Sequence, residues 1–91
     1  MVDEYRIRLH KKAIKDKDKI KSIPALKRNA DELLALLKAD PFKSPPSYEE
    51  LEGDLKGLYS RRLNRKHRLV YAVDKEDKIV KILSMWTHYR D

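Results

Sequence analysis

The chain has 91 residues, a formal net charge of +7 and an isoelectric point near 9.7. Charged and hydrophobic residues each make up 41% of it, which excludes the disordered class, where hydrophobic residues are scarce. We expect a single domain over residues 1–91, because this length supports one modest core and not two. The excess of positive charge favours a polyanionic partner, with nucleic acid ahead of a membrane surface.

The sequence contains no cysteine, which excludes a disulfide framework and suits a reducing cytosol. It also contains no run of about 18 apolar residues, the length that a membrane-spanning helix needs. We therefore expect a cytoplasmic protein that does not enter the membrane.

The first third of the chain predicts one strand and two helices. Tyr5, Ile7 and Leu9 alternate with polar residues, which is the period of a half-buried strand. Residues 10–23 predict a short lysine-coated helix with a thin apolar stripe, made of Ala13, Ile14, Ile20 and Ile23. Residues 24–40 predict the clearest helix, which begins at a proline and repeats apolar residues at helical spacing: Leu26, Ala30, Leu33 and Leu37, widened by Leu34 and Leu36.

The rest of the chain predicts a long loop and three strands. Residues 41–54 contain three prolines and a glycine, so we expect a loop, and a loop of this length in a small domain is usually functional. Strands are predicted at Leu58–Leu63, His67–Val73 and Ile79–Thr87, joined by short turns. The fold class is then α+β with the order β-α-α-β-β-β, two helices covering one face of a twisted antiparallel sheet. The first strand is expected at an edge or beside the last strand.

Positive charge is concentrated in two segments with an acidic segment between them. Arg6–Arg28 has ten basic and two acidic residues, Asp40–Asp54 has one basic and five acidic residues, and Lys56–Arg68 has six basic and no acidic residues. Lysines in the first segment are typical of a solvated helix face, which can also make diffuse contacts with nucleic acid. Arginine is better suited to hold phosphate, because its planar guanidinium donates two parallel hydrogen bonds.

The residues that could carry chemistry lie far apart in the sequence. Cutting RNA requires a base for the 2′-hydroxyl, a cation for the phosphate and an acid for the departing oxygen. The candidates are Glu49 or Glu50 on the loop, Arg62 and Arg68 on strands, and His88 with Tyr89 near the end. A salt bridge from Arg68 to a loop carboxylate is the alternative for that arginine. With no cysteine and no histidine pair at i, i+4, we expect no metal site and no cofactor.

Several short motifs occur in a fixed order. They are Asp40-Pro41-Phe42, Glu49-Glu50-Leu51, Gly57, Tyr59-Ser60-Arg61-Arg62, His67-Arg68-Leu69-Val70-Tyr71 and His88-Tyr89. This set resembles the Txe/YoeB branch of the RelE toxin superfamily, over roughly Leu33 to Tyr89. The resemblance implies a RelE-like, microbial-ribonuclease-like fold and the toxin of a type II toxin–antitoxin pair. Such a toxin is an endoribonuclease that cleaves mRNA in the ribosomal A site.

The resemblance also implies roles and partners. Glu49 would be the general base, Arg68 the group that stabilises the transition state, and His88 the general acid. Arg62 and Arg61 would bind substrate, and Tyr89 would stack on or position a base. The partners would be mRNA on the ribosome with its ribosomal RNA, a YefM/Phd-type antitoxin and, in a homodimer, a second copy of the chain.

The loop departs from the family pattern, with Tyr48 where the family has proline and Glu52 where a basic residue is common. This leaves Glu49 and Glu50 both open as the base, although the spacing to Leu51 and Gly57 favours Glu49. The Arg90–Asp91 tail also follows the His-Tyr pair that usually ends the family's sequences. Two other functions fit the same sequence: a ParE-like toxin that inhibits DNA gyrase, and a non-catalytic RNA-binding module.

Overall fold

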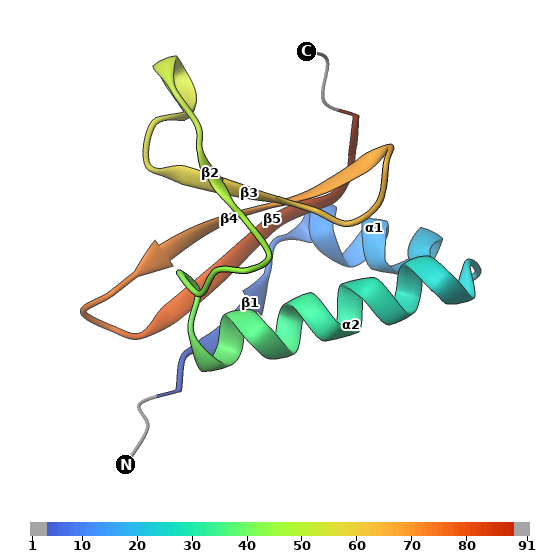
Figure 1. Cartoon of the computed structure of the whole chain (residues 1–91), viewed down its shortest axis with the longest axis horizontal. Helices are drawn as coiled ribbons and strands as arrows, with labels where there is room; N and C mark the ends of the chain where they lie inside the picture. Colours follow the sequence, from blue (N-terminus) through green and yellow to red (C-terminus); the bar gives the residue numbers. More distant parts are fainter. Residues whose placement is uncertain (1–3, 89–91) are drawn as a thin grey trace.

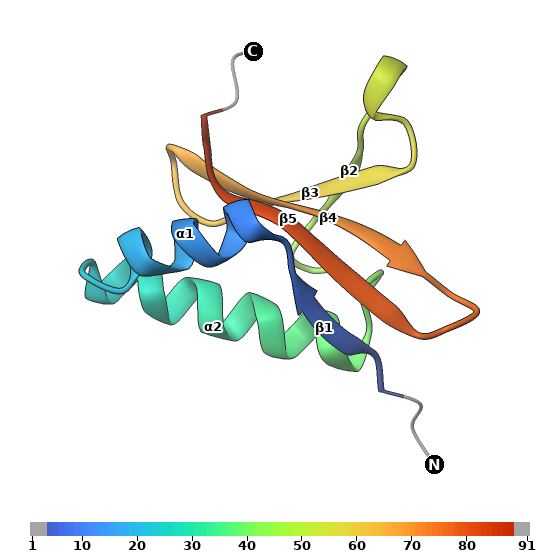
Figure 2. The same ribbon diagram turned by 180° about the vertical axis from the view of Figure 1, so that it is seen from behind.

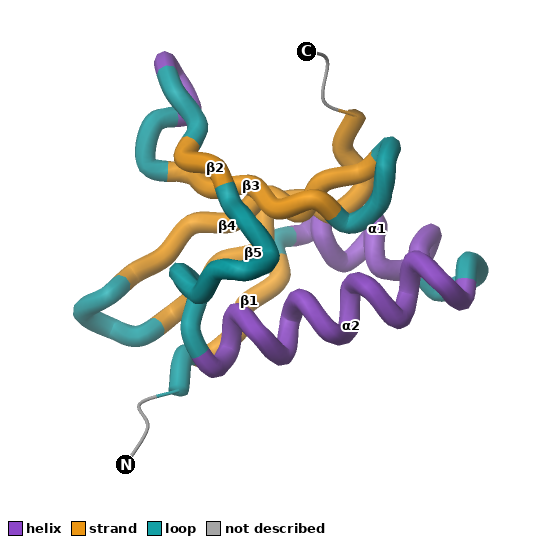
Figure 3. The backbone as a smooth tube through the Cα atoms, in the orientation of Figure 1, coloured by secondary structure: helices purple, strands orange, loops and turns teal. Residues whose placement is uncertain are grey.

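The computed structural model describes residues 4–88, with the backbone alone at 87 and 88. Two helices cover one face of a five-stranded sheet, and the other face is left open (Figures 1 and 2). Figure 3 shows the same chain by type of element. The elements are β1 (Arg6–Leu9), α1 (Lys11–Ile20), α2 (Pro24–Ala39), β2 (Glu49–Glu50), a 3-10 turn (Gly53–Leu55), β3 (Leu58–Arg62), β4 (His67–Asp74) and β5 (Ile79–His88).

The strands lie in the order β1-β5-β4-β3-β2. The predicted α+β class and the order β-α-α-β-β-β are confirmed, and β1 is both the edge strand and the neighbour of β5. Two details differ from the prediction. β1 runs parallel to β5, so the sheet is not wholly antiparallel, and the predicted loop contains the short strand β2, paired with Tyr59 and Ser60 of β3.

α2 buries the four residues predicted for its core stripe, Leu26, Ala30, Leu33 and Leu37. In α1 the prediction of the stripe was wrong in part. Ala13 and Ile20 are buried, but Ile14 is 52% exposed and Ile23, just beyond the helix, is 39% exposed. The third buried residue of α1 is Asp16, because the helix packs against β5 along the row that contains this carboxylate. No helix of the described part of the chain is long and apolar enough to cross a membrane.

The sheet contributes Leu69 and Tyr71 from β4 and Val80, Ile82 and Met85 from β5 to the same core. β5 is irregular near its end. Arg68 pairs with Thr87 and Val70 pairs with Ser84, so two residues of β5, Met85 and Trp86, lie opposite Leu69 alone. Such a bulge bends a strand and re-aims the residues that follow it.

Candidate functional site

Strand alternation brings four polar side chains to the open face of the sheet. Paired residues of neighbouring antiparallel strands point to the same face. Glu49 pairs with Ser60 and Arg62 pairs with Arg68, while the alternate residues of β4, such as Leu69 and Tyr71, are in the core. The site therefore consists of Glu49, Ser60, Arg62 and Arg68, drawn from β2, β3 and β4.

Arg68 is the centre of this site. Its Nη1 lies 3.7 Å from Oε2 of Glu49 and donates a 2.9 Å hydrogen bond to Oγ of Ser60. The side chain of Arg68 is 14% exposed and that of Glu49 is 63% exposed. The distance to Glu49 is longer than a charge-assisted hydrogen bond, which is about 2.7–2.9 Å. The two groups attract each other, and the carboxylate stays accessible to a substrate.

The two loop carboxylates differ in position. Glu49 lies beside Arg68, whereas Glu50 pairs with Tyr59 and points to the other face of β2. Burial of Tyr59 raises the pKa of its hydroxyl, and the negative charge of Glu50 adds to this rise. Of the two, Glu49 is therefore the carboxylate that faces the arginines. The sequence motifs include Ser60 without assigning it a role, and its alternation with Arg62 places it on the same face.

A pocket of about 300 Å³ surrounds these groups, lined by Pro46, Ser47, Tyr48, Glu49, Ser60, Arg62 and Arg68. A second pocket of about 200 Å³ lies next to it, lined by Asn29, Glu32, Leu33, Leu36, Pro46, Arg62 and Leu63. Arg62, which is exposed, lines both pockets. Its guanidinium therefore lies at the border between the two pockets.

Arg61 does not belong to this face. Its side chain is fully buried, and its guanidinium donates to the carbonyl oxygens of Pro41, Lys43 and Pro46 and, through Nε, to the hydroxyl of Tyr71. This burial contradicts the expectation that Arg61 binds substrate alongside Arg62. The physical reason is strand alternation, which turns adjacent residues to opposite faces.

The buried guanidinium shapes the loop that leads to Glu49. Four neutral oxygen atoms replace the water that the cation would otherwise require, and the ring of Tyr48 lies 4.8 Å from its Cζ. Burial raises the pKa of the Tyr71 hydroxyl, although the bond from Arg61 opposes this rise. The protonated hydroxyl also donates to Pro41 at 2.9 Å. The loop thus folds around Arg61, and Glu49, which follows it, lies beside Arg68.

The remaining candidates lie at the end of β5. The backbone of His88 pairs with His67, but its side chain and the whole of Tyr89 lie outside the described residues. His67 is buried and stacked on Trp86 with 4.0 Å between ring centres, and Nδ1 of His10 caps α1 by accepting from the amide of Lys12. Neither of these histidines lines the pocket around Arg68.

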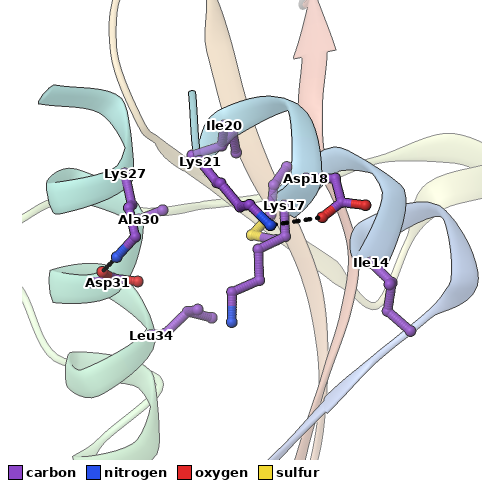
Figure 4. A pocket seen from close by; sticks show the side chains of 10 residues that line it. Ile14, Lys17, Asp18, Ile20, Lys21, Lys27, Ala30, Asp31 and Leu34 are labelled. Carbon is purple, nitrogen blue, oxygen red and sulfur yellow. Dashed lines mark hydrogen bonds and ion pairs between the residues drawn. The ribbon is translucent and has the colours of Figure 1, made fainter. Parts of the chain in front are cut away.

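Another pocket, of about 240 Å³, lies between α1 and α2 and contains none of the candidate residues. Apolar side chains such as Ile14, Ile20 and Leu34 line it, and the ion pairs Lys21–Asp18 and Lys27–Asp31 flank it (Figure 4). Within residues 4–88, no three His, Cys, Asp or Glu side chains are arranged to hold a metal ion.

A family model described as the YoeB-like toxin of bacterial type II toxin–antitoxin systems matches residues 12–89 of the chain. The chain belongs to this family. Toxin YoeB of Streptomyces coelicolor is 39% identical over 62 residues, which cover 68% of this chain and 71% of that protein. The match confirms the resemblance seen in the motifs.

Solved structures of toxins agree. YoeB of Staphylococcus aureus, at 32% identity, has a TM-score of 0.81 as a dimer, covering 94% of this chain and 99% of that one. In complex with YefM its TM-score is 0.80, covering 93% and 98%. The archaeal RelE of the RelE–RelB complex from Pyrococcus horikoshii is 32% identical with a TM-score of 0.70 over both whole chains. The YoeB family's RelE-like fold is therefore the fold of this chain.

Proposed function

We propose that this YoeB-family toxin is a ribosome-dependent endoribonuclease that cleaves mRNA in the A site and so inhibits translation. The observation that carries the proposal is the position of Glu49 beside Arg68 on the open face of the sheet, 3.7 Å apart. An accessible carboxylate next to a largely buried guanidinium supplies a base and a phosphate-stabilising cation in one pocket.

In this mechanism Glu49 removes the proton of the 2′-hydroxyl, and the oxygen attacks the adjacent phosphorus. Arg68 stabilises the charge that develops on the phosphate, and Ser60 orients Arg68 through the 2.9 Å bond. His88 protonates the departing 5′-oxygen, which leaves a 2′,3′-cyclic phosphate. The nucleophile belongs to the RNA itself, so the reaction is metal-independent. Arg62 holds a neighbouring phosphate, and Tyr89 stacks on a base.

The partners follow from the family. We infer that a YefM/Phd-type antitoxin binds this chain and that two copies form a homodimer, because YoeB of Staphylococcus aureus has been solved in both assemblies. The net charge of +7 suits association with ribosomal RNA in the cytoplasm.

The adjacent carboxylates provide a matched test. Glu49→Gln should lower the rate of cleavage at least about 100-fold, the usual contribution of a general base, whereas Glu50→Gln should stay close to the parent rate. The measurement is primer extension on a translated message with purified toxin, with and without ribosomes. Equal losses in both variants would contradict the role of Glu49.

Two further results would point to other functions. Cuts of naked RNA at the same rate as ribosome-bound message would remove the ribosome from the proposal. Toxicity that survives Arg68→Ala and His88→Gln and is accompanied by inhibition of DNA gyrase would support the ParE-like alternative, while RNA binding without any cleavage would support a binding module.

A further inference from the structure

The open face of the sheet extends past the site to β1, which lies beside β5 at the opposite edge from β2 (Figure 2). Residues that pair across neighbouring strands point to the same face, and so do alternate residues of one strand. Ala72 lies four residues after Arg68 on β4, so both point to the open face. Lys81 pairs with Ala72, and Arg8 pairs with Lys81. The register therefore puts Arg8 and Lys81 on the face of Arg68.

The burial of the neighbouring residues agrees with this assignment. Val80 and Ile82, on either side of Lys81 in β5, are fully buried in the core. The two residues on either side of Arg8 in β1 also pack against the core. Arg8 and Lys81 themselves are exposed. Alternation between core and solvent thus gives the same direction for both cations as the register does.

Arg8 and Lys81 are two cations side by side without an anion. Paired residues of neighbouring strands are close together, since the strands lie about 4.8 Å apart, and like charges in this arrangement repel each other. Within the described part of the chain, neither residue forms an ion pair. The carboxylate of Asp74 belongs to the next row, which contains Arg6. A phosphate bound between Arg8 and Lys81 would remove their repulsion.

The surface between Arg68 and this pair of cations is uncharged. Val70, which is 8% exposed, lies midway and pairs with Ser60 on one side and Ser84 on the other. The four residues from Arg68 to Ala72 span about 13 Å along the strand. Stacked nucleotides advance about 3.4 Å each, so this span corresponds to about four nucleotides. A strand of RNA bound at Arg68 can therefore reach the two cations without leaving the open face.

We propose that Arg8 and Lys81 bind the message a few nucleotides beyond the cleaved phosphate, so that the open face is a track for single-stranded RNA. The proposal rests on the proposed function. In the A site the codon on the 5′ side is paired with tRNA, so the strand available to this track lies on the 3′ side of the cut. Because the two cations are distant from the reacting atoms, they contribute to binding of the message and not to the chemical step.

The test compares two ribosome-bound messages with the same 5′ portion, one ending with the cleaved codon and one extending well beyond it. Both carry a 5′ label, so that products are separated on a gel and kcat and KM are measured for each. The parent should have the lower KM for the extended message. In the double variant Arg8→Gln, Lys81→Gln we expect the KM for the extended message to rise on the order of 10-fold, because two phosphate contacts are lost. Its kcat, and its KM for the short message, should stay at the parent values.

The matched control is the double variant Arg28→Gln, Lys38→Gln. It removes the same two types of charge from exposed positions of α2, which covers the other face of the sheet. This variant should keep the parent's difference in KM between the two messages. An unchanged KM in the Arg8 and Lys81 variant, or an equal loss of the difference in the control, overturns the proposal. An equal rise in KM for both messages also overturns it and assigns the two cations to ribosomal RNA.

The double variant Arg8→Lys, Lys81→Arg separates the loss of charge from a change in the fold. It keeps both positive charges, so its KM for the extended message should stay near the parent value. A rise as large as that of the glutamine variant would overturn the proposal, since the charge would then not be what binds. A parent toxin that cleaves neither message would instead overturn the proposed function, and this inference with it, so the two failures are distinguishable.

Discussion

Arg61 and Asp16 are both charged and both buried, but different groups surround them. Arg61 is bound by neutral oxygen atoms, three of them carbonyls of the loop before β2. Asp16 is bound by two backbone amides of β5 and by the ammonium group of Lys12, which reaches it from the surface. The first charge is permanent at any working pH, and the second is titratable.

The comparison separates charges that shape the site from charges that can meet a substrate. Arg61 binds the loop that leads to Glu49, and Asp16 binds the amides of Met85 and Trp86 in β5, so each connects parts of the chain that are far apart in sequence. Arg62, the neighbour of Arg61 in sequence, is exposed and free of this structural task. A basic cluster read from sequence therefore contains residues of two kinds.

Replacing Arg61 should have the largest effect on stability. Arg61→Met leaves buried carbonyls and the Tyr71 hydroxyl without their donor, and each such group costs about 1–3 kcal/mol. We expect a loss of at least about 4 kcal/mol in the free energy of unfolding, measured by urea denaturation with Trp86 fluorescence. The exposed Arg65→Met is the control and should change stability little. A stable Arg61→Met variant would show that the loop does not depend on the guanidinium.

Replacing Asp16 should have an intermediate effect that depends on pH. The pKa of Asp16 is lowered in the folded protein, so its contribution is complete above the ordinary carboxyl pKa of about 3.9 and is lost as the pH falls through the folded value. Asp16→Asn should cost about 2 kcal/mol at pH 7, the worth of hydrogen bonds to a charged group.

The difference in unfolding free energy between parent and Asp16→Asn should shrink as the pH falls below about 4. Urea denaturation at a series of pH values measures it. The corresponding difference for Arg61→Met should not follow this titration, because the arginine keeps its charge. A difference for Asp16 that is constant with pH would mean that packing, and not the ionised carboxylate, supplies its stability.

The smallest effect is expected for Tyr71→Phe. This change removes the hydroxyl that accepts from Arg61 and donates to Pro41, and leaves the ring in the core. A loss of about 1–2 kcal/mol is expected. Tyr59→Phe is the matched control, because Tyr59 belongs to the same aromatic cluster but not to the hydrogen bonds around Arg61. Equal effects of the two changes would argue against a specific role for the Tyr71 hydroxyl.

The sequence by itself determined the order of the elements, the apolar stripe of α2 and the residue types of the site. These follow from local periodicity and from motifs, which need no knowledge of distant contacts. It also placed Arg62 and Arg68 on strands. It left Glu49 and Glu50 open as the base, and only the pairing of β2 with β3 distinguishes which carboxylate lies beside Arg68.

Only the tertiary structure shows that the charged side chains of Arg61 and Asp16 are buried. Strand alternation alone predicts that Arg61 and Arg62 point to opposite faces of the sheet. It does not predict that Arg61 is buried, because a buried guanidinium needs acceptors, and two of the carbonyls that bind it belong to residues 15 and 20 positions earlier in the chain. Asp16 likewise meets amides 69 and 70 residues later. A charged side chain is exposed unless the fold supplies partners, and these partners come together only when the helices, the loop and the sheet are assembled.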